Sequence, residues 1–345
     1  MPRFKSSVFV LGAFLALHWA SRCQDTMPGD QERDSGPSSS IARQRPPIPE
    51  IGRPVLFNTA EADRILRAMQ VFPIDNPWNE DVSRRSVDPN SRNLIGSVGA
   101  EKSLAYNLDM GFIIVPPDQT KVSVKINEYP DESDAGPYPI PGNAPIEGWP
   151  VDGQDLEALQ RVGRGDRHML VVDPVNMKLF EFYHTRMTAA GWTAGQASIF
   201  DLKSNSLRPV GWTSTDAAGL PIFPAVVRFD EVEQGMVEHA LRFTIRNSRR
   251  AYVRPATHHA SSKTDVNLPR MGERFRLRRD FDVSRYSPHP QAILKGLKKY
   301  GMFVADNGGD WRISVAPDGR IKGLDELRRV KGKDFEVVQP APEAR

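Results

Sequence analysis

Hydrophobic and polar positions alternate along much of this chain with the period of a β-strand. From Lys121 to Ile126 every second residue is apolar, so one face of the segment should be buried and the other solvated. Residues 168–184 form two apolar runs around Pro174-Val175-Asn176, which predicts a hairpin with a proline turn. Both faces of the second run are apolar, which indicates a strand that lies between two layers.

Further short strands are expected wherever apolar runs are bounded by Pro and Gly. They are predicted at 196–200, 223–229, 239–246, 251–253, 275–278, 302–305, 311–315 and 335–338. Helices are few: one at 59–69 capped by Asn58, one at 288–300 that begins with Pro288 after Ser287, and a short one at 323–330. This pattern predicts a mainly β fold, a single domain of β-sandwich or jelly-roll type with a few peripheral helices.

The first 22 residues have the organisation of an export signal. Arg3 and Lys5 precede an apolar run from Val8 to Ala20, which is too short to span a bilayer, so no membrane span is predicted. A secreted or periplasmic location is therefore expected. Cys23 stands where a lipoprotein carries its lipid, but Arg22 occupies a position that such a site reserves for a small residue, so lipid anchoring is disfavoured.

The remaining chain divides by composition into three parts. Residues 23–52 are rich in Pro, Ser and charged residues and should form a disordered tether, because they offer too little apolar surface to offset the entropy of ordering. The folded domain is predicted over 53–338, followed by a disordered tail at 339–345. No internal repeat interrupts the domain.

Composition excludes several classes of protein. Of 345 residues 39% are hydrophobic, enough for a sizeable core, and the formal net charge is only +3. An even charge balance disfavours a nucleic-acid partner. A single cysteine cannot form an internal disulfide. No glycine-rich phosphate loop, GxSxG, HExxH or paired CxxC motif is present, which argues against nucleotide chemistry and a zinc site, so no metal or other cofactor is expected.

Charge is segregated along the domain. Residues 128–166 hold nine acids and two arginines, whereas residues 242–299 hold fifteen basic residues and four acids. The two stretches either pair with each other or are separately solvated, or the basic one forms a trough for an anionic polysaccharide. Asp131, Glu132 and Asp134 could chelate Ca²⁺, although their spacing does not match a calcium loop and an exposed turn is the alternative.

Glu181 is the first candidate catalytic residue. It lies between Leu179 and Tyr183 on one face of the predicted central strand, where apolar surroundings would raise its pKa and suit it to act as a general acid. Asp230 or Glu231 could supply the second carboxylate that glycosidic cleavage requires. The alternative is a structural ion pair between Glu181 and an arginine.

A second candidate chemistry is β-elimination from a uronate. Tyr252 and His258 could remove the proton while Arg254 neutralises the sugar carboxylate. Arg242 is a further candidate ligand-binding cation. Strand alternation places His239 and Arg242 on opposite faces of one strand, so these two side chains should not serve the same site.

Aromatic and loop residues add candidate binding positions. Trp192 and Trp212 lie beside turn residues and could provide flat platforms for sugar rings, the alternative being that they cap the edge of the core. The loop 200–222 is long and polar for a compact domain, so the functional site is expected beside it.

Three strings of the sequence carry a resemblance. They are Gly211 to Ile222 (GWTSTDAAGLPI), His239 to Phe243 (HALRF) and Tyr300 to Gly308 (YGMFVADNG). With them the chain resembles a group of exported bacterial proteins of uncharacterised activity. The resemblance implies export and a single domain, and it assigns no catalytic residue.

Together these observations favour an exported protein that acts on polysaccharide, as a glycoside hydrolase or a polysaccharide lyase. The alternative is a non-catalytic carbohydrate-binding or envelope structural module, and the sequence leaves open whether the protein is an enzyme. The oligomeric state is likewise open.

Overall fold

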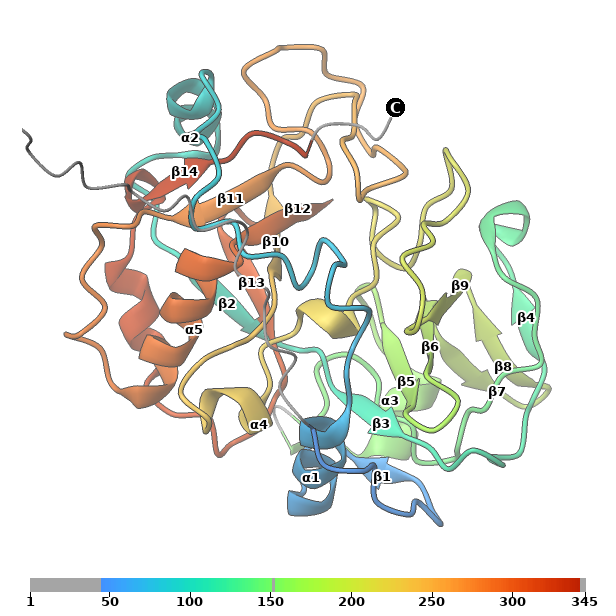
Figure 1. Ribbon diagram of the computed structural model, residues 1–345. Helices are drawn as coiled ribbons and strands as arrows, with labels where there is room; N and C mark the ends of the chain where they lie inside the picture. The colour runs from blue at the N-terminus through green and yellow to red at the C-terminus, as the bar shows by residue number, and fades with distance from the viewer. Residues whose placement is uncertain (1–44, 151–152, 342–345) are drawn as a thin grey trace, which may run out of the picture. The chain divides into compact units, whose positions relative to one another are not determined.

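The computed structural model describes residues 45–150 and 153–341, and the main feature of this part is three β-sheets (Figure 1). The strands are β1 (Val55–Leu56), β2 (Ala105–Leu108), β3 (Phe112–Ile114), β4 (Val124–Ile126), β5 (Met169–Asp173), β6 (Lys178–Tyr183), β7 (Arg186–Thr188), β8 (Gly191–Ala194), β9 (Gln196–Asp201), β10 (Leu241–Ile245), β11 (Arg274–Leu277), β12 (Met302–Asn307), β13 (Arg312–Val315) and β14 (Phe335–Val337). The predicted β-rich class is confirmed. The sandwich or jelly-roll arrangement stays a prediction.

The helices are short and lie among the strands. The α-helices are α1 (Ala60–Ala68), α2 (Ser91–Val98), α3 (Leu156–Arg161), α4 (Phe229–Val232) and α5 (Pro288–Lys299), and the 3₁₀ helices are η1 (Pro130–Glu132), η3 (Phe223–Ala225), η4 (Leu324–Arg329) and η5 (Gly332–Asp334). None of the helices in the described ranges is long and apolar enough to cross a bilayer.

Each sheet contains both parallel and antiparallel pairs. The strand orders are β1-β3-β5-β6-β9, β14-β11-β12-β10-β13-β2 and β4-β8-β7. In the six-stranded sheet β10 runs parallel to β12 and antiparallel to β13, which in turn runs parallel to β2. Segments that are far apart in the sequence are therefore neighbours across β12, β10, β13 and β2.

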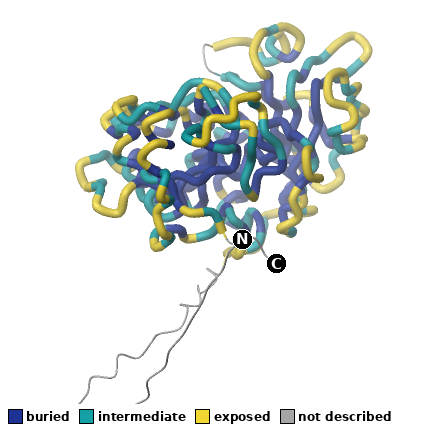
Figure 2. Tube along the Cα trace, turned by 90° about the horizontal axis from the view of Figure 1, so that it is seen from above, coloured by how far each residue is buried: buried dark blue, intermediate teal, exposed yellow. Residues whose placement is uncertain are grey.

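The predicted hairpin is confirmed as β5 and β6, and it separates two hydrophobic cores. On β5, Leu170 and Val172 face the larger core, whereas Met169 and Val171 face the smaller one. Alternate residues point to opposite faces of a strand, so a strand buried on both faces serves two layers. Figure 2 shows the buried segments gathered in the interior and the exposed ones in peripheral loops.

The larger core is organised around Trp311. Its ring lies 5.8 Å from Phe243, 5.7 Å from Phe275 and 5.1 Å from Phe335, and its Nε1 donates to the carbonyl of Gly99 at 3.0 Å. Phe243 alternates with Arg242 along β10. One face of this strand therefore belongs to the aromatic core, and the other is left to polar side chains.

Several predicted boundaries need correction. Thr59, rather than Asn58, caps α1, because its Oγ1 accepts from the amide of Ala62 at 3.2 Å. The strand predicted at 223–229 is wrong: this segment forms η3 and the start of α4, with Pro224 in the first turn of η3. The strand predicted at 251–253 is reduced to one bridge between Tyr252 and Met271.

The predicted export signal, Cys23 and most of the predicted tether lie outside the described residues. Within the described part, Ile51 is buried in the larger core and Ile48 packs against it. Ordered packing thus includes the last residues of the segment predicted as tether. All described residues belong to one compact unit.

Gly272 offers a test of the packing between β11 and residues 253–256. Its φ is +79°, and a Cβ added there would lie 2.0 Å from the carbonyl oxygen of Val253. Gly272→Ala should lower the free energy of unfolding by about 2 kcal/mol or more, because the backbone must shift and a left-handed conformation is strained for alanine. Urea denaturation measures the change.

Gly52→Ala is the matched control, since nothing lies within 4 Å of its added Cβ. This variant should stay within about 0.5 kcal/mol of the parent protein. Equal unfolding midpoints for the two variants would contradict the described packing.

Candidate functional site

Glu181 is enclosed on the inner face of β6, with no exposed surface. Its carboxylate accepts from the amides of Ile222 at 2.9 Å and Phe223 at 2.8 Å, and from the hydroxyl of Thr215 at 3.1 Å. Burial raises the pKa of Glu181 to about 7 against these three donors. The carboxylate joins β6 to the segment that follows β9, with no surface left for a sugar to touch.

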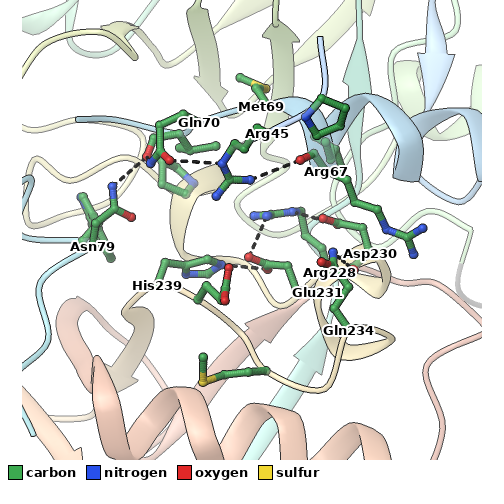
Figure 3. Close-up of a pocket in the computed structure, with 17 residues that line it drawn as sticks. Arg45, Arg67, Met69, Gln70, Asn79, Arg228, Asp230, Glu231, Gln234 and His239 are labelled. Atoms are coloured by element: carbon green, nitrogen blue, oxygen red, sulfur yellow. Dashed lines mark hydrogen bonds and ion pairs between the residues drawn. The ribbon is translucent and has the colours of Figure 1, made fainter. Parts of the chain in front are cut away.

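Asp230 and Glu231, the proposed partners of Glu181, belong to a separate network. Both lie on α4 and pair with Arg228, at 3.2 Å from its Nε and 2.9 Å from its Nη2. His239 Nε2 lies 3.0 Å from the second oxygen of Glu231 (Figure 3). The structure therefore does not place Glu181 in one hydrogen-bonded network with either carboxylate.

This second network lines a cavity of ≈350 Å³, the α4 pocket, between the C-terminal end of α1, α4 and residues 236–239. Burial raises the pKa of Asp230 to about 6, although Arg228 opposes the shift. Burial also disfavours the ionised form of Glu231, but Arg228 and His239 together hold its pKa below the ordinary value. Two adjacent carboxyls thus differ in their ease of ionisation.

The residues proposed for β-elimination have three different environments. Tyr252 packs against the larger core, and Arg254 is exposed. His258 Nδ1 lies 2.8 Å from the carbonyl oxygen of Ala217, and its ring stacks on His259 with centroids 5.6 Å apart. The catalytic role of these three residues stays a prediction.

The two tryptophans proposed as sugar platforms are engaged in other contacts. Trp192 is 5% exposed and forms part of the smaller core. Trp212 is half-buried, and the guanidinium of Arg208 lies 5.5 Å from its ring centroid. In this conformation Trp192 presents no face to a ligand.

The proposed calcium ligands serve the loop that follows β9. Glu132 accepts from the amide of Thr213 at 2.6 Å, and Asp134 pairs with Arg208 at 2.5 Å and accepts from Ile199 at 2.8 Å. Asp131 is exposed. No group of three or more His, Cys, Asp or Glu side chains in the described ranges could hold a metal ion. Calcium binding stays a prediction.

Arg242, proposed as a ligand-binding cation, is buried and has its hydrogen bonds within the protein. Its Nε and Nη2 each donate to Asp216 at 2.7 Å, and its Nη1 donates to Ser314 on the neighbouring strand β13 at 2.6 Å. Arg242 is 4% exposed and Asp216 is fully buried. His239 lies before β10 rather than on it and pairs with Glu231, so His239 and Arg242 have different partners, although strand alternation does not separate them.

A cluster of charged groups surrounds this pair. We define the Arg242 cluster as Asp109, Glu147, His168, Asp216, Arg242 and Asp306. Burial raises the pKa of Asp109 to about 7 and that of Asp306 to about 7, with further contributions from the negative charges of Glu147 and Asp216 respectively. Arg242 opposes both shifts. Asp109 and Asp306 are half-buried rather than enclosed.

Glu147 and His168 form the side of the cluster next to β5. The amide of Glu147 donates to the carbonyl of His168 at 2.8 Å, and the amide of His168 donates to the Glu147 carboxylate at 3.2 Å. Burial and the charge of Arg242 lower the pKa of His168 to about 4, so the ring is neutral at pH 7. Burial raises the pKa of Glu147.

The arrangement can carry out proton transfer near neutral pH. A carboxyl whose pKa is about 7 exists in both forms at that pH, so it can donate or accept a proton. Carboxyls with raised pKa that gather around one cation are typical of active sites. The cluster lies beside the long loop 200–222, where the functional site was expected, because Asp216 belongs to that loop.

Sequence reasoning overlooked five of the six members of the cluster as site residues. Asp109, Glu147 and His168 lie in short loops that match no motif. A signal existed for the others: Asp216, Arg242 and Asp306 each come from one of the three strings that carry the resemblance. The structure brings these three strings together at one buried guanidinium.

Comparison of the chain with protein-family models, with curated proteins and with solved structures gives no match.

Replacing Asp216 should test the buried pair. Asp216→Asn leaves the Arg242 guanidinium without its counter-charge, and breaking a buried pair in this way costs about 3–5 kcal/mol of unfolding free energy. Urea denaturation at pH 7 measures the loss. The control is Asp325→Asn, because Asp325 pairs with Arg328 at the surface and should contribute less than about 1 kcal/mol. Equal losses of unfolding free energy in the two variants would show that the pair of Arg242 and Asp216 stabilises the fold no more than a surface pair does.

The raised pKa values also predict how stability depends on pH. Asp109, Glu181 and Asp306 keep protons in the folded state up to about pH 7, whereas the unfolded chain loses them near pH 4. Their contribution is complete below the unfolded pKa and is lost as pH rises through the folded one. His168 acts in the opposite sense, but only between about pH 4 and 6.5.

Thermal unfolding should therefore show a Tm that falls from pH 6.5 to pH 8. Asp306→Asn should flatten this decline, because one of the titrating carboxyls is gone. A Tm that rises over the same interval in the parent protein would refute the assignment.

Proposed function

We propose that the protein hydrolyses polysaccharide by carboxyl acid–base chemistry at the Arg242 cluster, outside the cytoplasm. The observation that carries this proposal is the presence of two half-buried carboxyls, Asp109 and Asp306, each with a pKa raised to about 7, around one guanidinium. Cleavage of a glycosidic bond requires one carboxyl in its acid form and one in its ionised form at the same pH.

Asp109 is assigned as the proton donor. Its Oδ1 is buried and has no hydrogen-bond partner among the described residues. The negative charge of Glu147 favours the protonated form of Asp109. In the reaction Asp109 gives its proton to the glycosidic oxygen as the bond between this oxygen and the anomeric carbon breaks.

Asp306 is assigned as the base. The amide of Asn307 donates to its Oδ1 at 2.6 Å, and a donor of this kind stabilises the ionised form. Asp306 takes a proton from the water whose oxygen bonds to the anomeric carbon. The proton that Asp109 gives to the leaving oxygen is thus matched by the one that Asp306 receives. Asp216 and Arg242 act as positioning residues, because their hydrogen bonds are made to each other and to the scaffold.

The non-catalytic alternative is less well supported by the contacts. It relied on Trp192 and Trp212 as platforms and on the basic stretch 242–299, which includes Arg242. Trp192 lies in a core, and Arg242 is buried against Asp216. The elimination alternative needs Tyr252, Arg254 and His258 to act together, and their environments differ. We also propose that the scaffold is a β-sandwich or jelly roll and that the protein is secreted or periplasmic.

The test is a screen of the full-length chain against neutral and acidic glycans, with new reducing ends measured as product. Asp109→Asn and Asp306→Asn should each reduce kcat/KM by about 10² or more, because each removes one proton-transfer group. Asp325→Asn, an exposed carboxyl on η4, is the matched control and should leave the rate unchanged.

Three results would overturn the proposal. Full activity in both variants excludes these carboxyls as acid and base. A product that absorbs in the ultraviolet identifies elimination rather than hydrolysis. A failure of the parent protein to cleave any member of the panel would return the protein to the class of binding modules.

A further inference from the structure

The α4 pocket contains buried hydrogen-bond donors that lack acceptors. Arg228 is 5% exposed, and its Nη1 has no hydrogen-bond partner in the described part of the chain. The same holds for Nε of Arg67, at the C-terminal end of α1. Both residues line the pocket. A buried donor left without an acceptor is costly, so these two guanidinium groups point to a ligand that brings oxygen acceptors.

Positive charge in the pocket is not limited to these two groups. Nδ1 of His239 lies 2.7 Å from the carbonyl oxygen of Ala240, and its Nε2 lies 3.0 Å from Glu231. Both neighbours are hydrogen-bond acceptors. Arg45 adds a third guanidinium to the lining of the pocket, which also holds the carboxyls of Asp230, Glu231 and Glu238.

The walls of the pocket suit a sugar ring as well as an anion. The lining includes five apolar side chains (Leu66, Met69, Trp78, Pro224 and Met236) and the side-chain amides of Gln70 and Asn79. A pocket with apolar walls and a few polar groups is typical of sites for small organic ligands. The cavity of ≈350 Å³ has space for one pyranose unit with its substituents.

We propose that the α4 pocket binds a uronate unit, with its carboxylate held by Arg228 and Arg67. The site is separate from the Arg242 cluster and deepens the proposed function, because it names an acidic polysaccharide as the substrate class. Asp230 and Glu231 then serve to orient Arg228, since each accepts from a different nitrogen of this guanidinium. A guanidinium suits this role because it can offer a carboxylate two parallel donors.

The experiment is calorimetric titration of the full-length chain with D-glucuronate, D-glucose and inorganic phosphate. Glucuronate should bind at least 10-fold more tightly than glucose, because only the former carries the carboxylate. It should also bind more tightly than phosphate, which has the charge but no ring to contact the apolar walls. Equal affinity for glucose and glucuronate would overturn the proposal, and preference for phosphate would identify a general anion site instead.

Variants of Arg67 test the assigned contact. Arg67→Met and Arg67→Lys should each weaken glucuronate binding at least 10-fold, since both remove the Nε donor and the second keeps the charge. Arg64→Met is the matched control, because Arg64 lies on the same helix and is exposed. Unchanged Tm values in the absence of ligand confirm that the variants fold. Parent-like affinity in both Arg67 variants would refute the site.

The two proposals fail separately. Asp109→Asn should lose hydrolysis and keep glucuronate binding, because Asp109 does not line the α4 pocket. If glucuronate binds but no glycan is cleaved, the proposed hydrolase activity is refuted and the proposed uronate site is supported. If glycans are cleaved but glucuronate does not bind, only the proposed uronate site is refuted.

Discussion

The buried pair of Arg242 and Asp216 is the interaction on which the polar half of this fold depends. Strand alternation on β10 requires that Phe243 enter the aromatic core and that Arg242 enter the opposite, equally dry side. A guanidinium can be buried only with a counter-charge and with its donors satisfied. Asp216 supplies the counter-charge and accepts two hydrogen bonds, Ser314 accepts a third, and the pair fixes the position of the loop 200–222.

The same pair explains the unusual ionisation of its neighbours. The negative charge of Asp216 offsets much of the positive charge of Arg242, so Arg242 stabilises the ionised forms of Asp109 and Asp306 only in part, and little water is present to do so. Burial then dominates and raises the pKa of both carboxyls. The same arrangement thus produces an ion pair at the centre and, around it, carboxyls whose pKa values are raised.

The two polar networks meet at Phe223. Its backbone amide donates to Glu181, and the guanidinium of Arg228 lies 5.3 Å from its ring centroid. Glu181 and Asp216 also lie close enough for the charge of Asp216 to raise the pKa of Glu181. The Arg242 cluster and the α4 pocket are therefore separate in their ligating groups but share the segment 215–228 as their support.

Local patterns in the sequence were sufficient for much of the secondary structure. The hairpin of β5 and β6 and the helix that starts at Pro288 both follow from local sequence patterns. The strand expected at 223–229 failed because Pro224 and the acids at 230 and 231 favour helical turns there, which the apolar run concealed.

The site was harder to predict, for a physical reason. Its members come from β10, β12 and several loops, and they meet only through the order of strands in the six-stranded sheet and the course of the loops. Glu181 was recognised as a buried carboxylate, yet its partners are backbone amides, which every residue other than proline possesses and which no sequence pattern reveals. Long-range pairing is the information that a single sequence lacks.

One consequence concerns the transfer of this segment to another protein. Thr215, Asp216, Ile222 and Phe223 are held by side chains of β6 and β10, whereas Ser214 links Asp216 and Leu220 within the loop. A designer who grafts the segment alone onto a new scaffold would keep the internal hydrogen bonds and lose those to the two strands. The unit to transfer is therefore the loop together with β6 and β10, whose side chains bind it.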